Sequence, residues 1–278
     1  MNPFTKTILR KKPRKIFWLF LMLTINCDLM LHLSYYKWDF SIQKQFSWSS
    51  STWTTPAYVI TIKGHDQRVP IVTSLFKKYA DLDLLPYYGI HGNAVYNTSS
   101  PKGLKPGEIG LRETMKNFFK MTIRMNYSEV FLFEDDAIPH LNFTAMFKQL
   151  PNRCREADVL LLGAIMWRRP KYWPSGICFD ANTVTFGSYA LFVKRSAYTS
   201  IVRWLQNDKK LPFDNMYPHL QKQGITVRVA YPPFLVIPEI SHASLIDNNR
   251  NKIQFNIKRR IAIHDWKLDN HPLFKIPV

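Results

Sequence analysis

Three consecutive acidic residues, Glu134-Asp135-Asp136, follow directly on the apolar run VFLF at 130–133. A continuous apolar run is typical of a strand buried on both faces of a sheet, and ligands of open α/β sheets bind outside the carboxyl ends of such strands. Because adjacent carboxylates repel one another, a divalent cation that prefers hard oxygen ligands, Mn²⁺ or Mg²⁺, would stabilise them and could bridge nucleotide phosphates. A solvated acidic turn with nothing bound is the alternative interpretation.

Two residues further along the chain could complete this chemistry. Asp214 carries a carboxylate that could act as a general base. Because it precedes the predicted helix 215–223, Asp214 could also be an N-cap, and the two roles are compatible. His242 could complete a metal site with Glu134 and Asp136, and its alternative role is that of a surface or packing residue.

Charged side chains near the predicted turns could contact a substrate. Arg68, after the predicted strand 57–62, could donate two hydrogen bonds to a nucleotide diphosphate, or it could be a solvated turn residue. Glu108 and Arg112 lie four residues apart on one face of a predicted helix. This spacing allows either an ion pair within the helix or a contact between these side chains and the substrate.

The elements that must position these residues alternate between strands and helices. Apolar or β-branched runs predict strands at 57–62, 130–133, 158–162, 189–193 and 226–231. Apolar residues spaced three and four apart predict helices at 69–79, 106–125, 197–206 and 214–223. This alternation favours an α/β domain with a mostly parallel central sheet, and no internal repeat is visible.

Composition restricts the class of protein. Hydrophobic residues make up 46% and aromatic residues 14% of the 278 residues, which is enough for a sizeable core and excludes a disordered chain. The net charge of +18 favours anionic partners such as glycans, phospholipid headgroups, nucleotide diphosphates or nucleic acid. The 3 cysteines are too few for a disulfide scaffold and too scattered for a structural zinc site, but Cys154 and Cys178 could pair.

The N-terminal residues indicate entry into the secretory pathway. Residues 1–15 are basic and would stay in the cytosol, 16–36 are apolar, and 37–56, which end in SWSSSTWTTP, are expected to form a stem before a domain at 57–278. We interpret 16–36 as an uncleaved signal anchor, with a cleavable signal peptide as the alternative. Sequons at Asn97, Asn126 and Asn142 agree with a domain in the lumen of the endoplasmic reticulum or Golgi.

The segment 104–139, LKPGEIGLRETMKNFFKMTIRMNYSEVFLFEDDAIP, resembles the central block of the family 25 glycosyltransferases. In that block Pro-Gly-Glu-Ile-Gly, a helix, an apolar strand and Glu-Asp-Asp follow one another. The family includes lipopolysaccharide galactosyltransferases and collagen hydroxylysine galactosyltransferases. Further segments resemble the family in the same order, so that the resemblance covers about 57–247: AYVITIKGHDQR at 57–68, YGIHG at 88–92, FGSYA at 186–190, LPFD at 211–214 and YPP at 231–233.

The resemblance implies a GT-A-type nucleotide-binding sandwich. It also implies a metal-dependent, inverting transfer of a hexose, commonly galactose, from a UDP-sugar to a hydroxyl of a glycan, lipopolysaccharide or protein. The expected site residues are Thr61, Arg68, Glu108, Arg112 and Asp135 toward the nucleotide, Glu134, Asp136 and His242 toward Mn²⁺ or Mg²⁺, and Asp214 as the base.

One segment departs from the family pattern. Where the family has Gly-Cys-x-x-Ser-His, the chain has GLRETM at 110–115, so that Thr114 replaces the Ser and Met115 replaces the His. This difference favours a second hypothesis, a membrane-tethered glycan-binding protein with a degenerate active site. A nucleic-acid binder would explain the charge, but the N-terminal signal argues against it. Under either remaining hypothesis the chain could form homo-oligomers.

Overall fold

The computed structural model describes residues 53–64, 66–97, 103–166, 178–208, 210–231, 234–239 and 268–272. The predicted signal anchor, the basic segment before it and His242 lie outside these residues. Within the described ranges, no helix is long and apolar enough to cross a membrane. The topology predicted for the N-terminal 52 residues therefore stays a prediction.

The packed part of the chain extends into the predicted stem. Trp53 packs edge-on against Phe131 and Phe147, and its indole Nε1 donates a hydrogen bond to the carbonyl of Ala80 at 2.8 Å. These contacts place Trp53 in the domain, upstream of the predicted domain start at residue 57. The sequence does not reveal this burial, because Trp53 stands in a Ser- and Thr-rich segment that has no periodicity.

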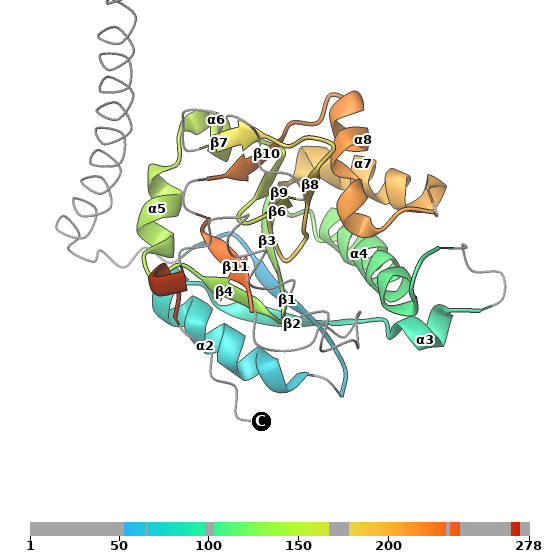
Figure 1. Ribbon diagram of the computed structural model, residues 1–278, viewed down its shortest axis with the longest axis horizontal. Coiled ribbons are helices and arrows are strands. Elements are labelled where there is room, and N and C mark those ends of the chain that lie inside the picture. The colour runs from blue at the N-terminus through green and yellow to red at the C-terminus, as the bar shows by residue number, and fades with distance from the viewer. Residues whose placement is uncertain are drawn as a thin grey trace, which may run out of the picture. The chain divides into compact units, whose positions relative to one another are not determined.

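A seven-stranded sheet forms the centre of the domain, with the strand order β2-β1-β3-β9-β5-β10-β7 (Figure 1). Its strands are β1 (Ala57–Ile62), β2 (Leu84–Gly89), β3 (Glu129–Glu134), β5 (Val159–Leu161), β7 (Cys178–Asp180), β9 (Ala190–Lys194) and β10 (Val227–Ala230). β1 is parallel to β2 and β3, β5 is parallel to β10, and β9 and β7 run antiparallel to their neighbours. Five strands thus share one direction, which confirms the α/β fold with a mostly parallel sheet.

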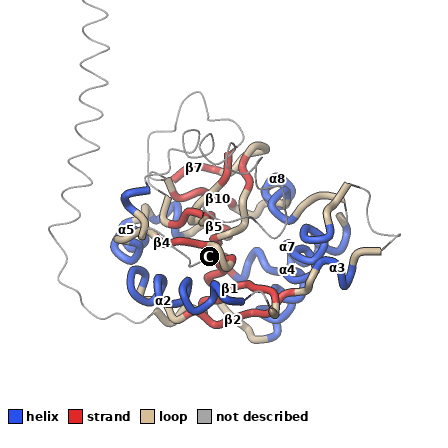
Figure 2. Tube along the Cα trace, turned by 60° about the horizontal axis from the view of Figure 1, so that its bottom comes forward, coloured by secondary structure: helices blue, strands red, loops and turns tan. Residues whose placement is uncertain are grey.

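Helices cover both faces of this sheet (Figures 1 and 2). One face carries α2 (Val69–Ala80), α5 (Phe143–Gln149) and α6 (Asn152–Arg155), and the other carries α4 (Pro106–Arg124), α7 (Arg195–Asn207) and α8 (Tyr217–Lys222). The alternation along β3 explains this arrangement. Val130 and Leu132 are buried in the core under α4 and α7, whereas Phe131 and Phe133 are buried in the core under α2 and α5.

Short elements complete the fold. They are η1 (Asp66–Arg68), α3 (Gly92–Val95), η2 (Phe213–Asn215), η3 (Leu268–Asn270), and the antiparallel pairs β4 (Ala137–Pro139) with β11 (Val236–Pro238) and β6 (Ile165–Met166) with β8 (Thr185–Phe186). The helix predicted at 214–223 is interrupted: η2 ends at Asn215, and α8 begins at Tyr217 with Pro218 in its first turn. The sequence analysis also missed β2, an edge strand that tolerates Pro86 because proline removes a donor that a central strand would need.

Cys154 and Cys178 form a disulfide bond with a Cα–Cα distance of 5.8 Å. The bond joins α6 to β7, the strand at one edge of the sheet. The pairing that the sequence allowed is therefore present in the structure. Cys27 lies outside the described residues.

Candidate active site

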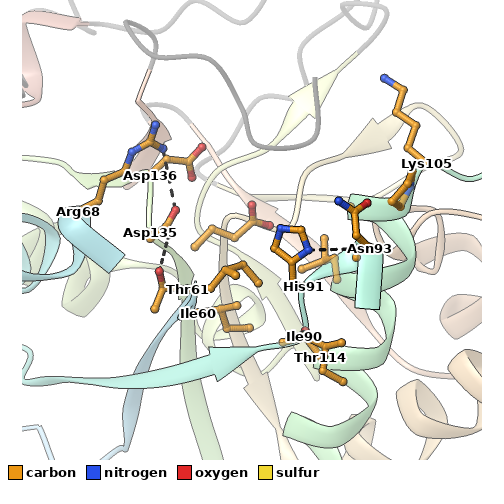
Figure 3. Close-up of a pocket in the computed structure, with 16 residues that line it drawn as sticks. Ile60, Thr61, Arg68, Ile90, His91, Asn93, Lys105, Thr114, Asp135 and Asp136 are labelled. Carbon is orange, nitrogen blue, oxygen red and sulfur yellow. Dashed lines mark hydrogen bonds and ion pairs between the residues drawn. The ribbon is translucent and has the colours of Figure 1, made fainter. Parts of the chain in front are cut away.

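A pocket of about 450 Å³ opens where β1, β2 and β3 end (Figure 3). Because these three strands are parallel, their carboxyl ends meet at the same edge of the sheet. One wall carries Thr61, Arg68 and the acidic residues 134–136. The opposite wall carries polar and basic side chains from α3 and the start of α4, among them Asn93 and Lys105.

Glycines allow the second wall to form. A Cβ atom on Gly92 would lie 2.0 Å from the carbonyl oxygen of Pro106, and one on Gly110 would lie 2.6 Å from that of Ile90. The two glycines therefore let the start of α4 lie directly against the segment after β2. Thr114 secures this contact, because its hydroxyl accepts from the N–H of Ile90 at 2.8 Å and donates to the carbonyl of Gly110 at 2.7 Å.

Asp135 is held by the two predicted nucleotide-binding residues beside it. Its Oδ2 accepts a hydrogen bond from the Thr61 hydroxyl at 2.7 Å, and its Oδ1 lies 4.0 Å from Nη1 of Arg68. Thr61 is the second-last residue of β1 and Arg68 is the last residue of η1, and both contact Asp135 just beyond the end of β3, which pairs with β1. The structure thus brings together three residues that the sequence analysis selected separately.

Glu134 and Asp136 are buried carboxylates that lie close to other acidic groups. Burial, and then the charge of Asp136, raises the pKa of Glu134 to about 8, although the Ser188 hydroxyl donates to its Oε1 at 2.6 Å. Burial, and then the charge of Asp135, raises the pKa of Asp136 to about 7. A nearby cation would favour the charged forms of both groups.

One oxygen atom of the acidic cluster is suited to bind a divalent cation. Oδ1 of Asp136 is buried and makes no hydrogen bond to any described residue, and a hard oxygen of this kind suits Mn²⁺ or Mg²⁺. Among the described residues, no three His, Cys, Asp or Glu side chains are arranged as a complete metal site. The third predicted ligand, His242, lies outside them, so the metal site stays a prediction.

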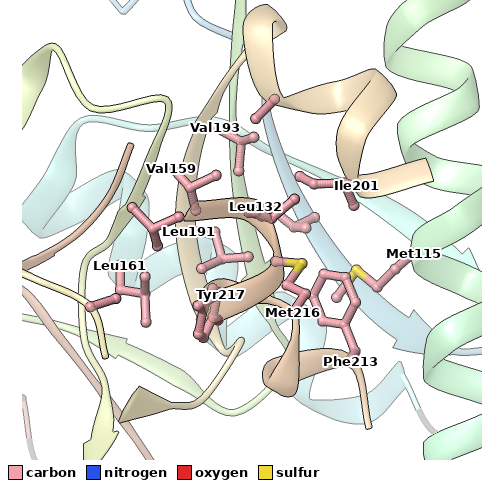
Figure 4. Close-up of a cluster of buried hydrophobic side chains, with 14 of the residues drawn as sticks. Met115, Leu132, Val159, Leu161, Leu191, Val193, Ile201, Phe213, Met216 and Tyr217 are labelled. Atoms are coloured by element: carbon pink, nitrogen blue, oxygen red, sulfur yellow. The ribbon is translucent and has the colours of Figure 1, made fainter. Parts of the chain in front are cut away.

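Asp214 lies on η2, close enough to Glu134 that its charge adds to the raised pKa of Glu134. Its Oδ2 accepts from the backbone N–H of Gly187 at 3.2 Å, and burial raises its own pKa. Phe213 and Met216, on either side of it, are buried in the core (Figure 4). The N-cap of α8 is Met216. The alternative interpretation of Asp214 as a helix N-cap is therefore wrong.

Glu108 and Arg112 do not pair with each other. The carboxylate of Glu108 accepts from the N–H of Lys105 at 2.7 Å at the start of α4, and its charge adds to the raised pKa of Asp214. Arg112 is buried, with 5% of its surface exposed, and is not among the residues that line the pocket. Its contact with a nucleotide is therefore a wrong prediction, because protein groups already satisfy its guanidinium.

The partners of Arg112 come from the end of α7 and the loop after it. The guanidinium donates to the carbonyls of Leu205, Asp208 and Leu211 and lies over the ring of Trp204 at 4.7 Å. These carbonyls include some of those that the last turn of a helix leaves without an intrahelical partner. Arg112 thus joins α4 to α7, which is a structural role.

Sequence analysis missed residues that reach the acidic cluster from other elements. Ser188 contacts Glu134 directly, and the N–H of Glu239 donates to the carbonyl of Asp136 at 2.6 Å. The charge of Glu239 also adds to the raised pKa of Asp136. The segment FGSYA was noted for its resemblance, which was a signal for Ser188, whereas no local pattern distinguishes Glu239.

No family model and no curated protein match the sequence. Among solved structures, the chain is similar to a glycosyltransferase involved in glycosylation of the major capsid of PBCV-1, with 6% identity and a TM-score of 0.41, over 73% of this chain and 99% of that chain. It is also similar to the inositol-1-phosphate CTP transferase from T. maritima, with 9% identity and a TM-score of 0.38 over 75% and 98%. A197 from STIV has 13% identity and a TM-score of 0.34 over 70% and 100%. Because these values are low, we base the function below on the residues of the pocket.

Proposed function

We propose that this protein is a glycosyltransferase of the GT-A type, related to family 25, that transfers a hexose from a UDP-sugar to a hydroxyl group. The observation that carries the proposal is the pocket at the end of β3, where Asp135 is held by Thr61 and Arg68 and Asp136 keeps a buried oxygen without a hydrogen bond to the described residues. Galactose is the expected sugar, and a glycan, lipopolysaccharide or protein is the expected acceptor.

The wall formed by Thr61, Arg68 and Asp135 would face the nucleotide. Arg68 carries donors that suit phosphate oxygens, and its distance of 4.0 Å from Asp135 leaves it room to turn toward a diphosphate. Asp136, with Glu134 and His242, would hold Mn²⁺ or Mg²⁺. When bound, that cation would supply positive charge that stabilises the leaving diphosphate.

Asp214 would be the base. An inverting transfer breaks the bond between the anomeric carbon and the diphosphate oxygen while the acceptor oxygen forms a bond to that carbon, and the acceptor proton must go to a base. Burial raises the pKa of Asp214, which makes its carboxylate a better proton acceptor than an ordinary aspartate. The Gly187 N–H holds one of its oxygens in place.

UDP release tests the proposal. We would incubate the full-length protein with UDP-galactose and, separately, UDP-glucose, with Mn²⁺ or with EDTA. Release that requires the metal and is abolished in Asp136→Ala is expected, and it would identify the donor. Asp83→Ala is the matched control, because Asp83 is exposed, pairs with Lys77, and precedes β2 at the opposite end of the strands. Equal activity in Asp136→Ala would contradict the mechanism.

One observation favours the second candidate, a glycan-binding protein with a degenerate site. Met115, at the position of the family's His, is fully buried in the core and cannot reach the pocket, and the Thr114 hydroxyl is engaged with Ile90. Under this alternative neither sugar nucleotide is turned over. Under the same alternative, adding UDP with Mn²⁺ should not change the melting temperature of the protein.

We propose that the protein is a type II membrane protein of the endoplasmic reticulum or Golgi with its domain in the lumen. The disulfide between Cys154 and Cys178 supports an oxidising compartment, because such bonds are rare in the cytosol. Proteinase protection of the domain in sealed microsomes tests this location. Cleavage of the domain without detergent would contradict it.

A further inference from the structure

Tyr189 lies beside the acidic cluster, in the segment that joins β8 to β9, and the mechanism above does not use it. Only 3% of its surface is exposed, and its hydroxyl is buried without a hydrogen bond to any residue that the structure describes. The residue precedes β9, and its carbonyl accepts from the N–H of Glu134 at 2.9 Å. This backbone bond sets Tyr189 directly beside the end of β3.

Two glycines make room for the Tyr189 ring. A Cβ atom on Gly163 would lie 2.5 Å from the Tyr189 hydroxyl oxygen, and one on Gly187 would lie 3.1 Å from its Cε1. Gly187 also has a φ of +98°, which side chains other than glycine rarely adopt. The two glycines therefore leave space for the ring, and the hydroxyl lies beside Gly163.

The surroundings of the hydroxyl keep it protonated. Burial, and then the charges of Asp136 and Glu134, raise the pKa of Tyr189 well above its usual value. The group is consequently a donor at neutral pH. Oδ1 of Asp136, the carboxylate whose charge acts on Tyr189 most strongly after burial, is a buried acceptor, likewise without a hydrogen bond to the described residues. A donor and an acceptor that both lack a bond thus lie in one buried cluster, where an unmade bond is costly.

We propose that Tyr189 is a positioning residue whose hydroxyl donates to the Asp136 carboxylate and holds it in the orientation that the incoming sugar nucleotide and its cation require. The contact between Tyr189 and Asp136 does not depend on the proposed function. The effect of this contact on catalysis rests on the proposed function.

A double-mutant cycle tests the contact without any ligand. The full-length variants Tyr189→Phe, Asp136→Ala and the double variant are unfolded in urea. We expect the two substitutions to be coupled by about fivefold or more in the unfolding equilibrium constant. Tyr198→Phe is the matched control, because Tyr198 is equally buried but donates to the carbonyl of Val193, and its cycle with Asp136→Ala should show no coupling. If Asp136→Ala does not fold, Asp136→Leu, which likewise has no acceptor, replaces it. Absence of coupling for Tyr189 would overturn the proposal.

Kinetics test the positioning role. In an active enzyme, Tyr189→Phe should lower kcat by about tenfold to 100-fold, with KM for the sugar nucleotide little changed, and Tyr198→Phe should lower neither. Coupling in a protein that turns over no sugar nucleotide would support the contact and contradict the proposed function. An active enzyme in which the two substitutions are not coupled would support the proposed function and contradict the contact.

Discussion

The three acidic residues 134–136 are neighbours in sequence but occupy different environments. Asp135 is matched by Thr61 and Arg68, Glu134 receives one hydroxyl from Ser188, and Oδ1 of Asp136 has no hydrogen bond to the described residues. Glu134 is the last residue of β3, whereas Asp135 and Asp136 form the turn between β3 and β4. The same motif can therefore supply a fixed nucleotide contact and a cation ligand.

His140 gives a pH-dependent prediction at this scale. Burial, and then the charge of His271, lowers its pKa to about 3 from 6.5. Between these values the unfolded chain binds a proton that the folded protein excludes. The free energy of unfolding should thus fall with decreasing pH, by up to about 1.4 kcal/mol per pH unit, and be unaffected by this group above pH 6.5.

Urea unfolding at pH 7 and pH 5 measures this effect. His140→Asn is the comparison, because the asparagine oxygen can replace Nδ1 as acceptor for the N–H of Asn142, 3.0 Å away, but does not titrate. The wild-type protein should lose more stability than the variant on going to pH 5. An identical loss in both would show that His140 is accessible to protons in the folded state.

Among the elements, the contact between α3 and α4 determines the shape of the pocket. We predict that Gly92→Ala destabilises the protein by about 1–3 kcal/mol, because its Cβ would lie 2.0 Å from the carbonyl oxygen of Pro106 and must push α4 away. The thermal shift caused by UDP and Mn²⁺ should shrink as well. Gly224→Asn is the control, since Gly224 has open space and a φ of +81° that asparagine tolerates. Equal UDP responses in the two variants would contradict this role of the α3–α4 contact.

At the scale of the whole molecule, the disulfide holds the edge of the sheet. The bond between Cys154 and Cys178 spans 24 residues. Replacing both by Ser should lower the free energy of unfolding by about 2–4 kcal/mol, mainly because the unfolded chain regains freedom. Urea unfolding with and without dithiothreitol measures this loss. Dithiothreitol should lower the free energy of unfolding of the wild type and leave that of the double variant unchanged. A wild type whose free energy of unfolding does not change with dithiothreitol would contradict the prediction.

The local sequence determined the elements on which the site depends. The run VFLF at 130–133 predicted a strand buried on both faces, and Pro106 with the apolar spacing after it predicted α4, because burial and helix starts leave local signatures. The acidic end of β3, and Thr61 and Arg68 near the end of the first strand, were likewise visible in the sequence. A broken helix at 214–223 was not, since one turn of 3-10 helix has the same apolar spacing as an α-helix.

The tertiary structure decided which of these residues meet. Arg112 and its carbonyl partners are separated by 93 to 99 residues, and Ser188 and Glu134 by 54. Spacing along the chain reports on burial, but such contacts depend on strand order and register, which sequence spacing does not encode. For this reason the sequence predicted an acidic site at the end of a strand, and only the fold removed Arg112 from it and added Ser188, Tyr189 and Glu239.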